Sequence, residues 1–406
     1  MNVEKVALFG LGKLGLPLSL VLAQEMKVVG IDTDIEKIKK LCVKTSPFYE
    51  PHIDEYLNSA FSNISFKTTN EYSIDEFDVA IILVNTPSDS EGKFSNKYIY
   101  DVIEDLSIKL RESNKKDFLF ILSSTVMPNS HKLIIDKIQD ISGKKLNEDF
   151  GFVYVPDLVA LGSVIKDFEN PDLLIMGESH IKYGNVAEKI YKKIIKNNSP
   201  IKRMSLIEGE ITKVSLNAYI TTKISFANFI GNVSEKFNCN PNNITSALGF
   251  DRRISPHFIK SGLAFGGTCF PRDTWAFIKM ADDLGLDAKH IKATQEINDF
   301  QNENLLQKLL LHKNKKIGVL GLSFKPNTTV DEKSPGLYLS ENLKKMGVDV
   351  ITYDKLIGTE YFGNFEKFVN DSDVIVITHN DSDFEKLKNF NITNKVIINP
   401  WNLNLQ

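Results

Sequence analysis

The sequence predicts an α/β protein with two Rossmann-like, doubly wound domains that are joined by a long central helix and a small helical domain. Short apolar runs alternate with helical patterns, a glycine-rich turn follows the first run, and a similar pattern returns near the C-terminus. Strands that alternate with helices form parallel sheets covered on both faces. We therefore expect an N-terminal domain in residues 1–205, a central helical and dimerisation domain in residues 206–312 and a C-terminal domain in residues 313–406.

The N-terminal domain begins with a strand, a glycine turn and a helix. Residues 6–9 are a short apolar run, and residues 14–25 have helical spacing with Pro17 in the first turn, where a missing N–H costs little. Continuous apolar runs that are too short for helices predict buried strands. Further strands are expected at residues 28–31, 79–84 and 118–122, with a helix around residues 98–110.

Part of this pattern is repeated near the C-terminus. VALFGLG (residues 6–12) returns as IGVLGLS (residues 317–323), but Ser323 stands where the first copy has Gly12. We therefore expect a second domain of the same kind that does not hold a dinucleotide in the same way. Between the two domains, Leu206–Phe237 runs for 32 residues without proline, so a continuous helix would be about 48 Å long. Helices of this length usually connect domains or subunits.

The composition excludes several classes of function. Lys and Arg total 49 against 52 Asp and Glu, a net charge of −3, so there is no basic excess to neutralise nucleic-acid phosphates. No stretch reaches the ~18–20 apolar residues of a membrane span, and no secretory signal begins the chain. The three cysteines are too widely spaced for a disulfide framework or a zinc cluster, and no metal site is expected. These observations favour a cytoplasmic protein without nucleic-acid or membrane partners.

Gly10-x-Gly12-x-x-Gly15 lies between the first strand and the first helix, which is the context of a dinucleotide-binding loop. In such a loop the first glycine permits a tight turn, the second lets the backbone approach a pyrophosphate, and the third lets helix and strand pack closely. Asp32 ends the second strand and can accept a hydrogen bond from a ribose 2′-hydroxyl, whereas a 2′-phosphate at ~4 Å would be repelled by about 4 kcal/mol. The loop therefore predicts NAD rather than NADP, with FAD as a competitor.

A lysine and an asparagine share one face of the predicted central helix. Lys213 and Asn217 are four residues apart, and Thr221 continues the same stripe. An ammonium and a carboxamide side by side can bind a hydroxyl and then stabilise the oxyanion that forms as hydride leaves its carbon. Taken alone, the pair is more typical of a solvated helix face, and only its place between two domains favours a site.

The most informative stretch is FGGTCFPRD at residues 265–273. Its two glycines leave the backbone free to lie against a ligand, and Cys269 is followed four residues later by Asp273. A thiol in such a loop is a candidate nucleophile, because cysteine is intrinsically very nucleophilic. The alternative is a small buried apolar side chain, which is the usual fate of cysteine and the one expected for Cys42 and Cys239.

With these residues in place, the chain resembles the nucleotide-sugar 6-dehydrogenases, and most closely their UDP-glucose dehydrogenase group. The resemblance covers nearly the whole chain and follows the family's order of motifs. It is carried by GLGKLGLP (10–17), SPFYEP (46–51), VNTP (84–87), SST (123–125), ITKVSLNAYITTKISFAN (211–228), FGGTCFPRD (265–273) and GLSFKPNT (321–328).

The resemblance implies a four-electron oxidation that turns the C6 hydroxyl of a nucleotide sugar into a carboxylate and reduces two NAD, as a step of polysaccharide biosynthesis. Cys269 would attack the C6 aldehyde, and the thiohemiacetal would lose a second hydride to give a thioester that water hydrolyses. Lys213 and Asn217 would stabilise the oxyanions, while Asp273 would handle protons through a water that Thr125 helps to place.

The same resemblance assigns residues to three groups and implies a homodimer. Catalytic residues would be Cys269, Lys213, Asn217, Asp273, Thr125 and Asp157. Cofactor-binding residues would be Gly10, Gly12, Gly15, Asp32, Thr86, Thr125 and Lys325. Residues that contact the sugar nucleotide would be Lys213, Asn217, Phe258, Lys260 and Gly266, with Arg253 reaching the sugar of the other subunit.

Five positions depart from the family pattern. The family's Pro-Glu-Phe is here Pro-Asp-Leu, with Asp157 in place of the glutamate, and a second common glutamate is Leu161. The shorter Asp157 can hold the hydrolytic water differently. Arg272 replaces a usual lysine, and Glu332 stands where an arginine that contacts the cofactor phosphate is frequent.

The FPRD that follows the cysteine is similar to the enzymes that oxidise UDP-glucose or GDP-mannose, whereas those acting on N-acetylated hexosamine nucleotides tend to have GVGGHC. UDP-glucose is therefore the expected substrate, with GDP-mannose or a UDP-N-acetylhexosamine as alternatives. Two other classes stay open. One is a two-electron β-hydroxyacid dehydrogenase, which also combines a glycine loop with a Lys-x-x-x-Asn helix, and the other is a non-catalytic protein that binds NAD and a sugar nucleotide.

Overall fold

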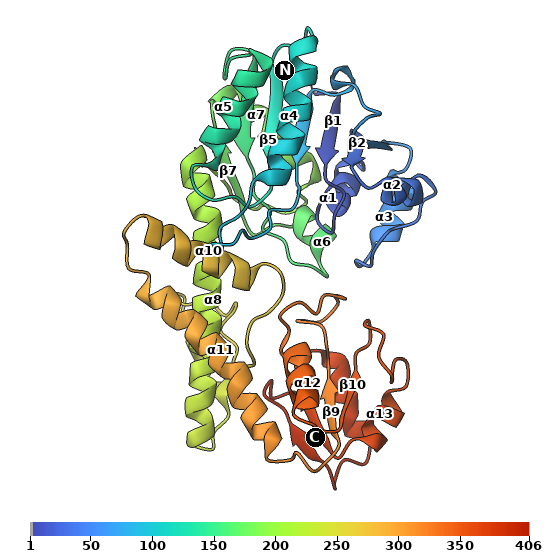
Figure 1. Ribbon diagram of the computed structural model, residues 1–406, viewed down its shortest axis with the longest axis vertical. Coiled ribbons are helices and arrows are strands. Elements are labelled where there is room, and N and C mark those ends of the chain that lie inside the picture. The colour runs from blue at the N-terminus through green and yellow to red at the C-terminus, as the bar shows by residue number, and fades with distance from the viewer. Residues whose placement is uncertain (1–2, 406) are drawn as a thin grey trace. The chain divides into compact units, whose positions relative to one another are not determined.

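Residues 3–405 are described in a computed structural model, where the chain divides into two compact units, residues 1–215 and 216–406. Each unit has its own hydrophobic cores. Figure 1 shows the helices and strands that form them. Within the described range, no helix is both long enough and apolar enough to span a lipid bilayer. The division of the chain into residues 1–205, 206–312 and 313–406 stays a prediction.

The first unit is built on an eight-stranded sheet with the strands β1 (Lys5–Phe9), β2 (Lys27–Asp32), β3 (Ile64–Thr68), β4 (Val79–Ile82), β5 (Phe118–Leu122), β6 (Phe150–Tyr154), β7 (Leu174–Glu178) and β8 (Ile201–Ser205). Their order is β3-β2-β1-β4-β5-β6-β7-β8. All neighbours are parallel except β6 and β7, where the expected parallel arrangement is wrong. The segment between these two strands contains one short helix, α6 (Val164–Glu169), and antiparallel neighbours need no long helical crossover.

Helices cover both faces of this sheet. One core joins the sheet to α1 (Gly15–Leu22), α3 (Ile53–Ala60), α6 and α7 (Ile181–Ile194), and α2 (Ile35–Cys42) packs at its edge. The other core joins the opposite face to α4 (Lys97–Glu112) and α5 (Ser130–Ser142), next to the short 3₁₀ turn η1 (Ile74–Glu76). The all-apolar strands, such as FLFIL in β5, are buried over their whole length because helices exclude water from both sides.

A long helix, α8 (Leu206–Lys236), begins in the first unit and continues into the second. It has 31 residues, one fewer than expected from the sequence, and the prediction of a continuous helix is confirmed. In the second unit it is followed by α9 (Pro241–Phe250), α10 (Phe270–Asp283) and α11 (Lys289–Leu310).

The second unit ends in a smaller parallel sheet of four strands, β9 (Ile317–Leu320), β10 (Val350–Tyr353), β11 (Val374–Ile377) and β12 (Val396–Ile398), in the order β10-β9-β11-β12. The helices α12 (Pro335–Lys345) and α13 (Phe365–Asp371) pack on opposite faces of it, and the 3₁₀ segment η2 (Ser382–Asn389) follows β11 (Figure 1). The expected second α/β domain is therefore present.

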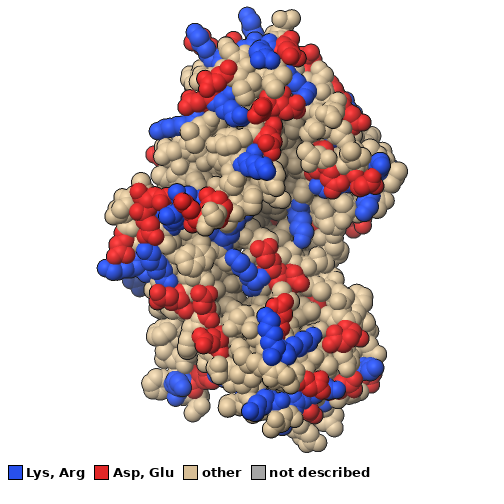
Figure 2. All heavy atoms as spheres, viewed as in Figure 1, with Lys and Arg blue, Asp and Glu red and all other residues tan. Residues whose placement is uncertain are grey.

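Charged side chains of both signs are interspersed on the face of the molecule that Figure 2 draws. No broad basic area is visible on that face. Many charged side chains of the protein form ion pairs, as Arg203 does with Glu178 and Glu188. A mixed surface of this kind gives little electrostatic attraction for a nucleic-acid backbone.

Candidate active site

The glycine loop after β1 has the backbone that its motif predicts. Gly10 has φ +95°, and a Cβ there would lie 2.3 Å from the Leu83 carbonyl oxygen. A Cβ on Gly15 would lie 1.8 Å from the Gly10 carbonyl oxygen, so helix α1 can approach the strand only because residue 15 has no side chain. A Cβ on Gly12 would meet nothing within 4 Å. The space beside Gly12 therefore fits a pyrophosphate, which would face the first turn of α1.

These two glycines give a matched pair of variants. Gly12→Ala is expected to leave the free energy of unfolding within about 1 kcal/mol of the wild type, because nothing in the protein opposes the new methyl group. It is expected to weaken NADH binding at least about tenfold, since the methyl group would lie where the pyrophosphate approaches. Gly15→Ala is expected to unfold the first unit, because its Cβ would overlap a backbone oxygen. Urea unfolding and NADH fluorescence titration measure both effects, and unchanged NADH affinity in Gly12→Ala would contradict the assignment.

Asp32 lies where β2 ends, at the same edge of the sheet. Its Oδ2 accepts hydrogen bonds from the backbone N–H of Leu11 at 2.8 Å and from Lys37 Nζ at 2.7 Å, and its Oδ1 accepts one from the Asp34 N–H at 2.9 Å. These contacts fix the carboxylate beside the glycine loop. Its negative charge is the feature that favours a ribose hydroxyl over a phosphate.

The loops that follow β4 and β5 are joined to each other by hydrogen bonds. Thr86 Oγ1 donates to the carbonyl oxygen of Thr125 at 2.8 Å. The Ser124 hydroxyl donates to the Val84 carbonyl oxygen at 2.8 Å and accepts from the Val84 N–H at 2.9 Å. The structure thus brings Thr86 and Thr125 together at the carboxyl edge of the sheet, where ligands of open α/β sheets bind.

Asp157 and Lys213 meet after β6. Lys213 Nζ donates to the backbone carbonyl oxygen of Asp157 at 2.5 Å, and both side chains are buried. Among residues 3–405, the Asp157 carboxyl oxygen Oδ2 has no hydrogen-bond partner. Burial raises the pKa of Asp157 to about 7, against the opposing effect of the Lys213 ammonium, so this carboxyl can exchange a proton near neutral pH.

Sequence reasoning missed Glu210, which lies one turn before Lys213 on α8. Its side chain is fully buried, and its carboxylate accepts hydrogen bonds from the backbone N–H groups of Asn129 at 2.7 Å and His131 at 2.8 Å. His131 Nδ1 lies 2.9 Å from the same carboxylate. The sequence shows a glutamate within a predicted helix, three residues before Lys213. It does not show that this side chain is buried, nor that its partners lie some 80 residues away.

In the second unit, a polar stripe on α8 faces α10. Asn217 Nδ2 donates to Asp273 Oδ2 at 2.6 Å, and Asp273 Oδ1 also accepts from Arg272 Nε at 3.0 Å. One turn further, the Thr274 hydroxyl donates to Thr221 Oγ1 at 3.1 Å. The stripe predicted from residues 213, 217 and 221 is therefore a set of buried polar contacts rather than a solvated face.

Cys269 immediately precedes α10, and its side chain is exposed. Its carbonyl oxygen accepts the Asp273 N–H at 2.8 Å, which places Asn217 and Asp273 one helical turn from the thiol-bearing residue. Cys42 and Cys239 are exposed as well, so the expectation that they are small buried apolar side chains is wrong. Cys42 is the last residue of α2, and Cys239 lies in the short connection between α8 and α9.

The loop before Cys269 packs closely against the segment that precedes α12. A Cβ on Gly266 would lie 2.3 Å from the Lys333 carbonyl oxygen, and Gly267, with φ +82°, donates its N–H to the Glu332 carbonyl oxygen at 2.9 Å. Glu332, one of the positions that depart from the family pattern, thus lies next to the cysteine loop and contacts it through its backbone carbonyl. A side chain at either glycine would push the cysteine loop away.

Two buried asparagines that sequence reasoning missed hold this loop from the helix side. Asn228 of α8 accepts the Gly262 N–H at 2.8 Å and donates to the Leu263 carbonyl oxygen at 2.8 Å. Asn298 of α11 binds both backbone groups of Phe265, accepting its N–H at 2.7 Å and donating to its carbonyl oxygen at 3.2 Å. Each amide therefore satisfies two loop groups that would otherwise be buried without partners.

Three further residues of the second unit are predicted to contact a ligand, Phe258 and Arg253 the sugar nucleotide and Lys325 the cofactor. Phe258 is half exposed, and its ring meets Phe270 edge to face at 6.3 Å, so it lies beside the start of α10. Arg253 is exposed, and its guanidinium pairs with the Asp251 carboxylate at 2.6 Å rather than with a residue of the cysteine loop. Lys325 lies in the loop after β9, in the second unit, and its cofactor contact stays a prediction.

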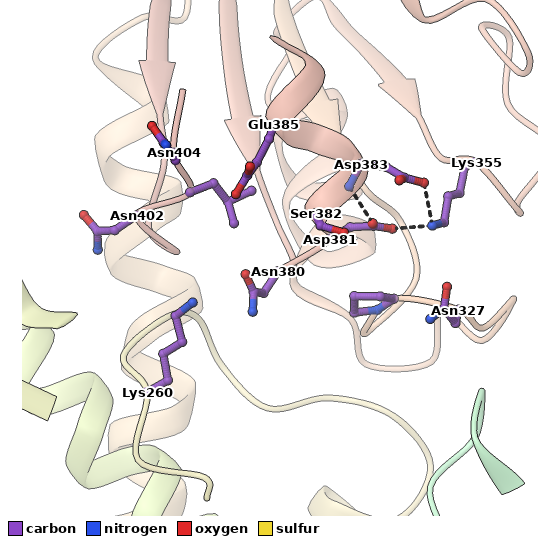
Figure 3. A pocket seen from close by; sticks show the side chains of 12 residues that line it. Lys260, Asn327, Lys355, Asn380, Asp381, Ser382, Asp383, Glu385, Asn402 and Asn404 are labelled. Carbon is purple, nitrogen blue, oxygen red and sulfur yellow. Dashed lines mark hydrogen bonds and ion pairs between the residues drawn. The ribbon is translucent and has the colours of Figure 1, made fainter. Parts of the chain in front are cut away.

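Lys260 lines a pocket of about 500 Å³ at the carboxyl edge of the smaller sheet (Figure 3). Polar side chains from the loops after β9, β10 and β11 form the opposite wall, and Lys355 is held there by Asp381 and Asp383 at 2.9 Å each. Besides Lys260, the labelled residues that line it are Asn327, Lys355, Asn380, Asp381, Ser382, Asp383, Glu385, Asn402 and Asn404.

The loop after β9 in the smaller sheet has the same backbone form as the glycine loop after β1, but it lacks the open space found beside Gly12. Gly321 has φ +101°, and a Cβ on Gly336 would lie 2.1 Å from the Gly321 carbonyl oxygen, as for Gly10 and Gly15 in the first unit. At the position of Asp32, Asp354 binds the N–H and the hydroxyl of Ser323. Burial raises the pKa of Asp354, but hydrogen bonds from His379 and from backbone N–H groups outweigh this effect and hold the pKa well below its usual range. The carboxylate is thus fully engaged within the protein.

Three family models cover most of the chain in the order of its elements. They are the NAD binding domain, the central domain and the UDP binding domain of the UDP-glucose/GDP-mannose dehydrogenase family, matched at residues 4–195, 208–300 and 318–404. The chain belongs to the UDP-glucose/GDP-mannose dehydrogenase family. It is an NAD-dependent nucleotide-sugar 6-dehydrogenase, and the predictions of the family, the fold, the enzyme class and the cofactor are confirmed.

Relatives with two different substrates are about equally similar to this dehydrogenase. A UDP-glucose 6-dehydrogenase of Rickettsia prowazekii is 30% identical over 94% of this chain and 90% of its own. A GDP-mannose 6-dehydrogenase of Pseudomonas syringae pv. tomato is 28% identical over 95% of this chain and 93% of its own. Among solved structures, a UDP-glucose dehydrogenase from Pyrobaculum islandicum superposes with a TM-score of 0.91 at 25% identity, over 99% of this chain and 95% of that one.

Proposed function

We propose that the dehydrogenase oxidises UDP-glucose to UDP-glucuronate through covalent intermediates on Cys269. The observation that carries the proposal is the exposed thiol at the start of α10, with Asp273 and Asn217 hydrogen-bonded to each other one turn further on. A two-electron dehydrogenase has no need of such a thiol. A protein that only binds its ligands has no need of a buried carboxylate–amide pair beside it.

The covalent route balances over two oxidations. In the first, C6 loses a hydride and its hydroxyl a proton, which gives the aldehyde. Cys269 Sγ then bonds to C6, the carbonyl oxygen takes up the thiol proton, and loss of a second hydride with that proton leaves a thioester. Water adds to the thioester, the C–S bond breaks, and the carboxylate and the free thiol are released. When bound, NAD supplies the acceptor for each hydride.

The buried polar groups supply charge stabilisation and proton transfer for this route. We assign the oxyanions to the Lys213 ammonium and the Asn217 amide, which lie one turn apart on α8. Asp273 would accept and return protons through a water. Asp157, whose pKa of about 7 suits a group that takes a proton near neutrality, would act on the hydrolytic water with Thr125.

The binding residues are assigned by the same reasoning. The glycine loop, Asp32, Thr86, Thr125 and Lys325 would hold NAD, and Phe258, Lys260 and Gly266 would hold the nucleotide sugar. The pocket beside Lys260 supports this, because ligands of open α/β sheets bind at the carboxyl ends of the strands. Its lining carries both acidic and basic groups, which suits the uncharged nucleoside end better than the phosphates.

We infer UDP-glucose from the FPRD sequence that follows Cys269, which is similar to the enzymes for UDP-glucose and GDP-mannose and unlike the GVGGHC of N-acetylhexosamine enzymes. A cytoplasmic location and a role in polysaccharide biosynthesis belong to the same proposal. The free thiol supports the location, because a reducing compartment keeps it unoxidised.

A panel of UDP-glucose, GDP-mannose and two UDP-N-acetylhexosamines, each with NAD, tests the proposal. Absorbance at 340 nm counts the NADH formed per sugar nucleotide, and mass spectrometry identifies the product. We expect two NADH for each UDP-glucose and a uronic acid product. One NADH per sugar nucleotide would favour a two-electron dehydrogenase. Faster turnover of another sugar nucleotide would overturn the assignment of UDP-glucose as the substrate. Binding without any absorbance change would favour a protein that only binds its ligands.

We also propose a homodimer that is formed through α8. Large apolar side chains are exposed along the second unit's part of this helix and at the residue that follows it, at spacings of seven, three, four and four residues, which places them on one helical face. They are Tyr219, Phe226, Phe229, Val233 and Phe237. Unpaired apolar stripes of this kind are typical of interaction surfaces. Arg253 would then contact the sugar nucleotide of the other subunit.

Phe229→Asp is expected to convert a dimer into a monomer, because a charge in the centre of an apolar contact must be desolvated. Analytical ultracentrifugation measures the mass of the particle at micromolar concentration. Phe362→Asp, at an equally exposed position outside this helix, is expected to leave the dimer intact. A monomeric wild-type protein would contradict the proposal.

A further inference from the structure

Glu210 joins the helix of Lys213 to the loop of Thr125. Its carboxylate receives the backbone N–H groups of Asn129 and His131 at 2.7 and 2.8 Å, at the start of α5. The helix has no side-chain cap of its own, since its N-cap, Asn129, makes no such hydrogen bond. A residue of α8 therefore caps α5 from outside, and it also satisfies the imidazole of His131 at 2.9 Å.

The loop held in this way is the one that reaches the carboxyl edge of the sheet. It leaves β5 at Ser123, passes Thr125 and enters α5 at Ser130. Its start is bonded to the loop after β4 through Ser124 and Thr86, and its end is bonded to Glu210. The loop is thus fixed at both ends, and one of the two attachments is a single buried carboxylate.

A carboxylate suits this place better than an amide. The two backbone N–H groups donate to different oxygens of Glu210, Asn129 to Oε2 and His131 to Oε1, so both oxygens of the side chain must be acceptors. The carboxylate also lies at the positive end of the α5 dipole, which stabilises a negative charge. Glutamine in its place would direct an NH₂ group at one of the donors, and the loop would have to move away.

We propose that Glu210 is a positioning residue of the cofactor site, which sets the loop of Thr125 relative to Lys213 so that NAD is bound in a productive place. The inference rests on the proposed assignment of Thr86 and Thr125 to the cofactor. Glu210 touches no ligand in this proposal. It acts through the loop, and small displacements of positioned groups have large effects on binding and turnover.

The test compares Glu210→Gln with Glu208→Gln in the full-length chain. Glu208 is an exposed carboxylate two residues earlier, and it too caps a helix, through the N–H and hydroxyl of Ser205 at 2.8 and 2.6 Å. Glu210→Gln is expected to raise the dissociation constant of NADH, measured by fluorescence titration, about tenfold or more, and to raise the KM for NAD by a similar factor. Glu208→Gln is expected to change both less than about twofold.

A second variant covers the case in which Glu210→Gln does not fold. His131→Leu removes the imidazole contact and leaves both backbone N–H groups on the carboxylate, so we expect a smaller rise in the NADH dissociation constant, about two- to fivefold. A lower melting temperature with unchanged NADH affinity in the folded variants would overturn the proposal, and so would an equal loss of affinity in Glu208→Gln. NADH binding needs no sugar nucleotide, so a wrong substrate assignment would leave this test unaffected.

Discussion

Cys269→Ala is expected to abolish the formation of uronic acid, with a loss of about 10⁴-fold or more in steady-state turnover. The thiol is the only group in the proposed route that bonds to C6, and removal of a covalent nucleophile leaves only the contribution of binding and charge stabilisation. Mass spectrometry of the product, together with NADH counted at 340 nm, measures the loss. Because Cys269 is exposed at the start of α10, the substitution is expected to leave the fold intact.

Cys42→Ala and Cys239→Ala are the matched controls, since both thiols are also exposed. Each is expected to keep turnover within about twofold of the wild type, because neither thiol has a part in the proposed route. Undiminished uronic acid from Cys269→Ala would rule out the covalent route.

Asp157→Asn is expected to lower turnover by about 10²–10³-fold, because the amide cannot accept a proton from the hydrolytic water. In the wild type, turnover is expected to rise with pH up to an apparent pKa near 7, as the carboxyl loses its proton. The variant is expected to lose this part of the pH profile. Asp172→Asn, at an exposed aspartate of the same unit, is expected to keep it.

The same variant has an opposite effect on stability. Burial raises the folded-state pKa of Asp157 from 3.8 to about 7, so the native state binds this proton more tightly than the unfolded chain does. The resulting stabilisation is present at low pH and is lost as the pH rises through 7, to a total of about 4 kcal/mol. Asp157→Asn removes this dependence. It is therefore expected to unfold at a free energy similar to that of the wild type at pH 4 and about 2–4 kcal/mol higher at pH 8.

Urea unfolding of both proteins at several pH values between 4 and 8 measures this difference. A gain in stability with a loss of turnover would identify Asp157 as a group kept for function at a cost to the fold. A constant difference across the pH range would show that Asp157 does not titrate there.

Local patterns in the sequence predicted the parts of the fold that local physics determines. The apolar runs of β1 and β5, the proline-free α8 and the spacing of Gly10, Gly12 and Gly15 each depend on neighbours a few residues away. The antiparallel pairing of β6 and β7 was not predictable, because strand direction depends on how the intervening chain packs.

The supports of the site could not be predicted for a similar reason. Asn228, Asn298 and Glu210 act through contacts 33 to 81 residues away, and an asparagine or glutamate in a helix carries no mark of such a partner. The exposure of Cys42 and Cys239 follows from their places at the last residue of α2 and in the connection after α8, and the residue type does not reveal it. Residue type and spacing therefore identified candidates for the chemistry, and the structure was needed to find what holds them.

The covalent intermediate itself is the most direct test of the account. Asp157→Asn slows hydrolysis in the proposed route, so the thioester should accumulate when this variant is mixed with UDP-glucose and NAD and quenched in acid. Peptide mass spectrometry is then predicted to find the UDP-glucuronyl group on the peptide that contains Cys269, and on neither of the peptides that contain Cys42 and Cys239. Two NADH formed per sugar, with Cys269 unmodified at every quench time, would contradict the account.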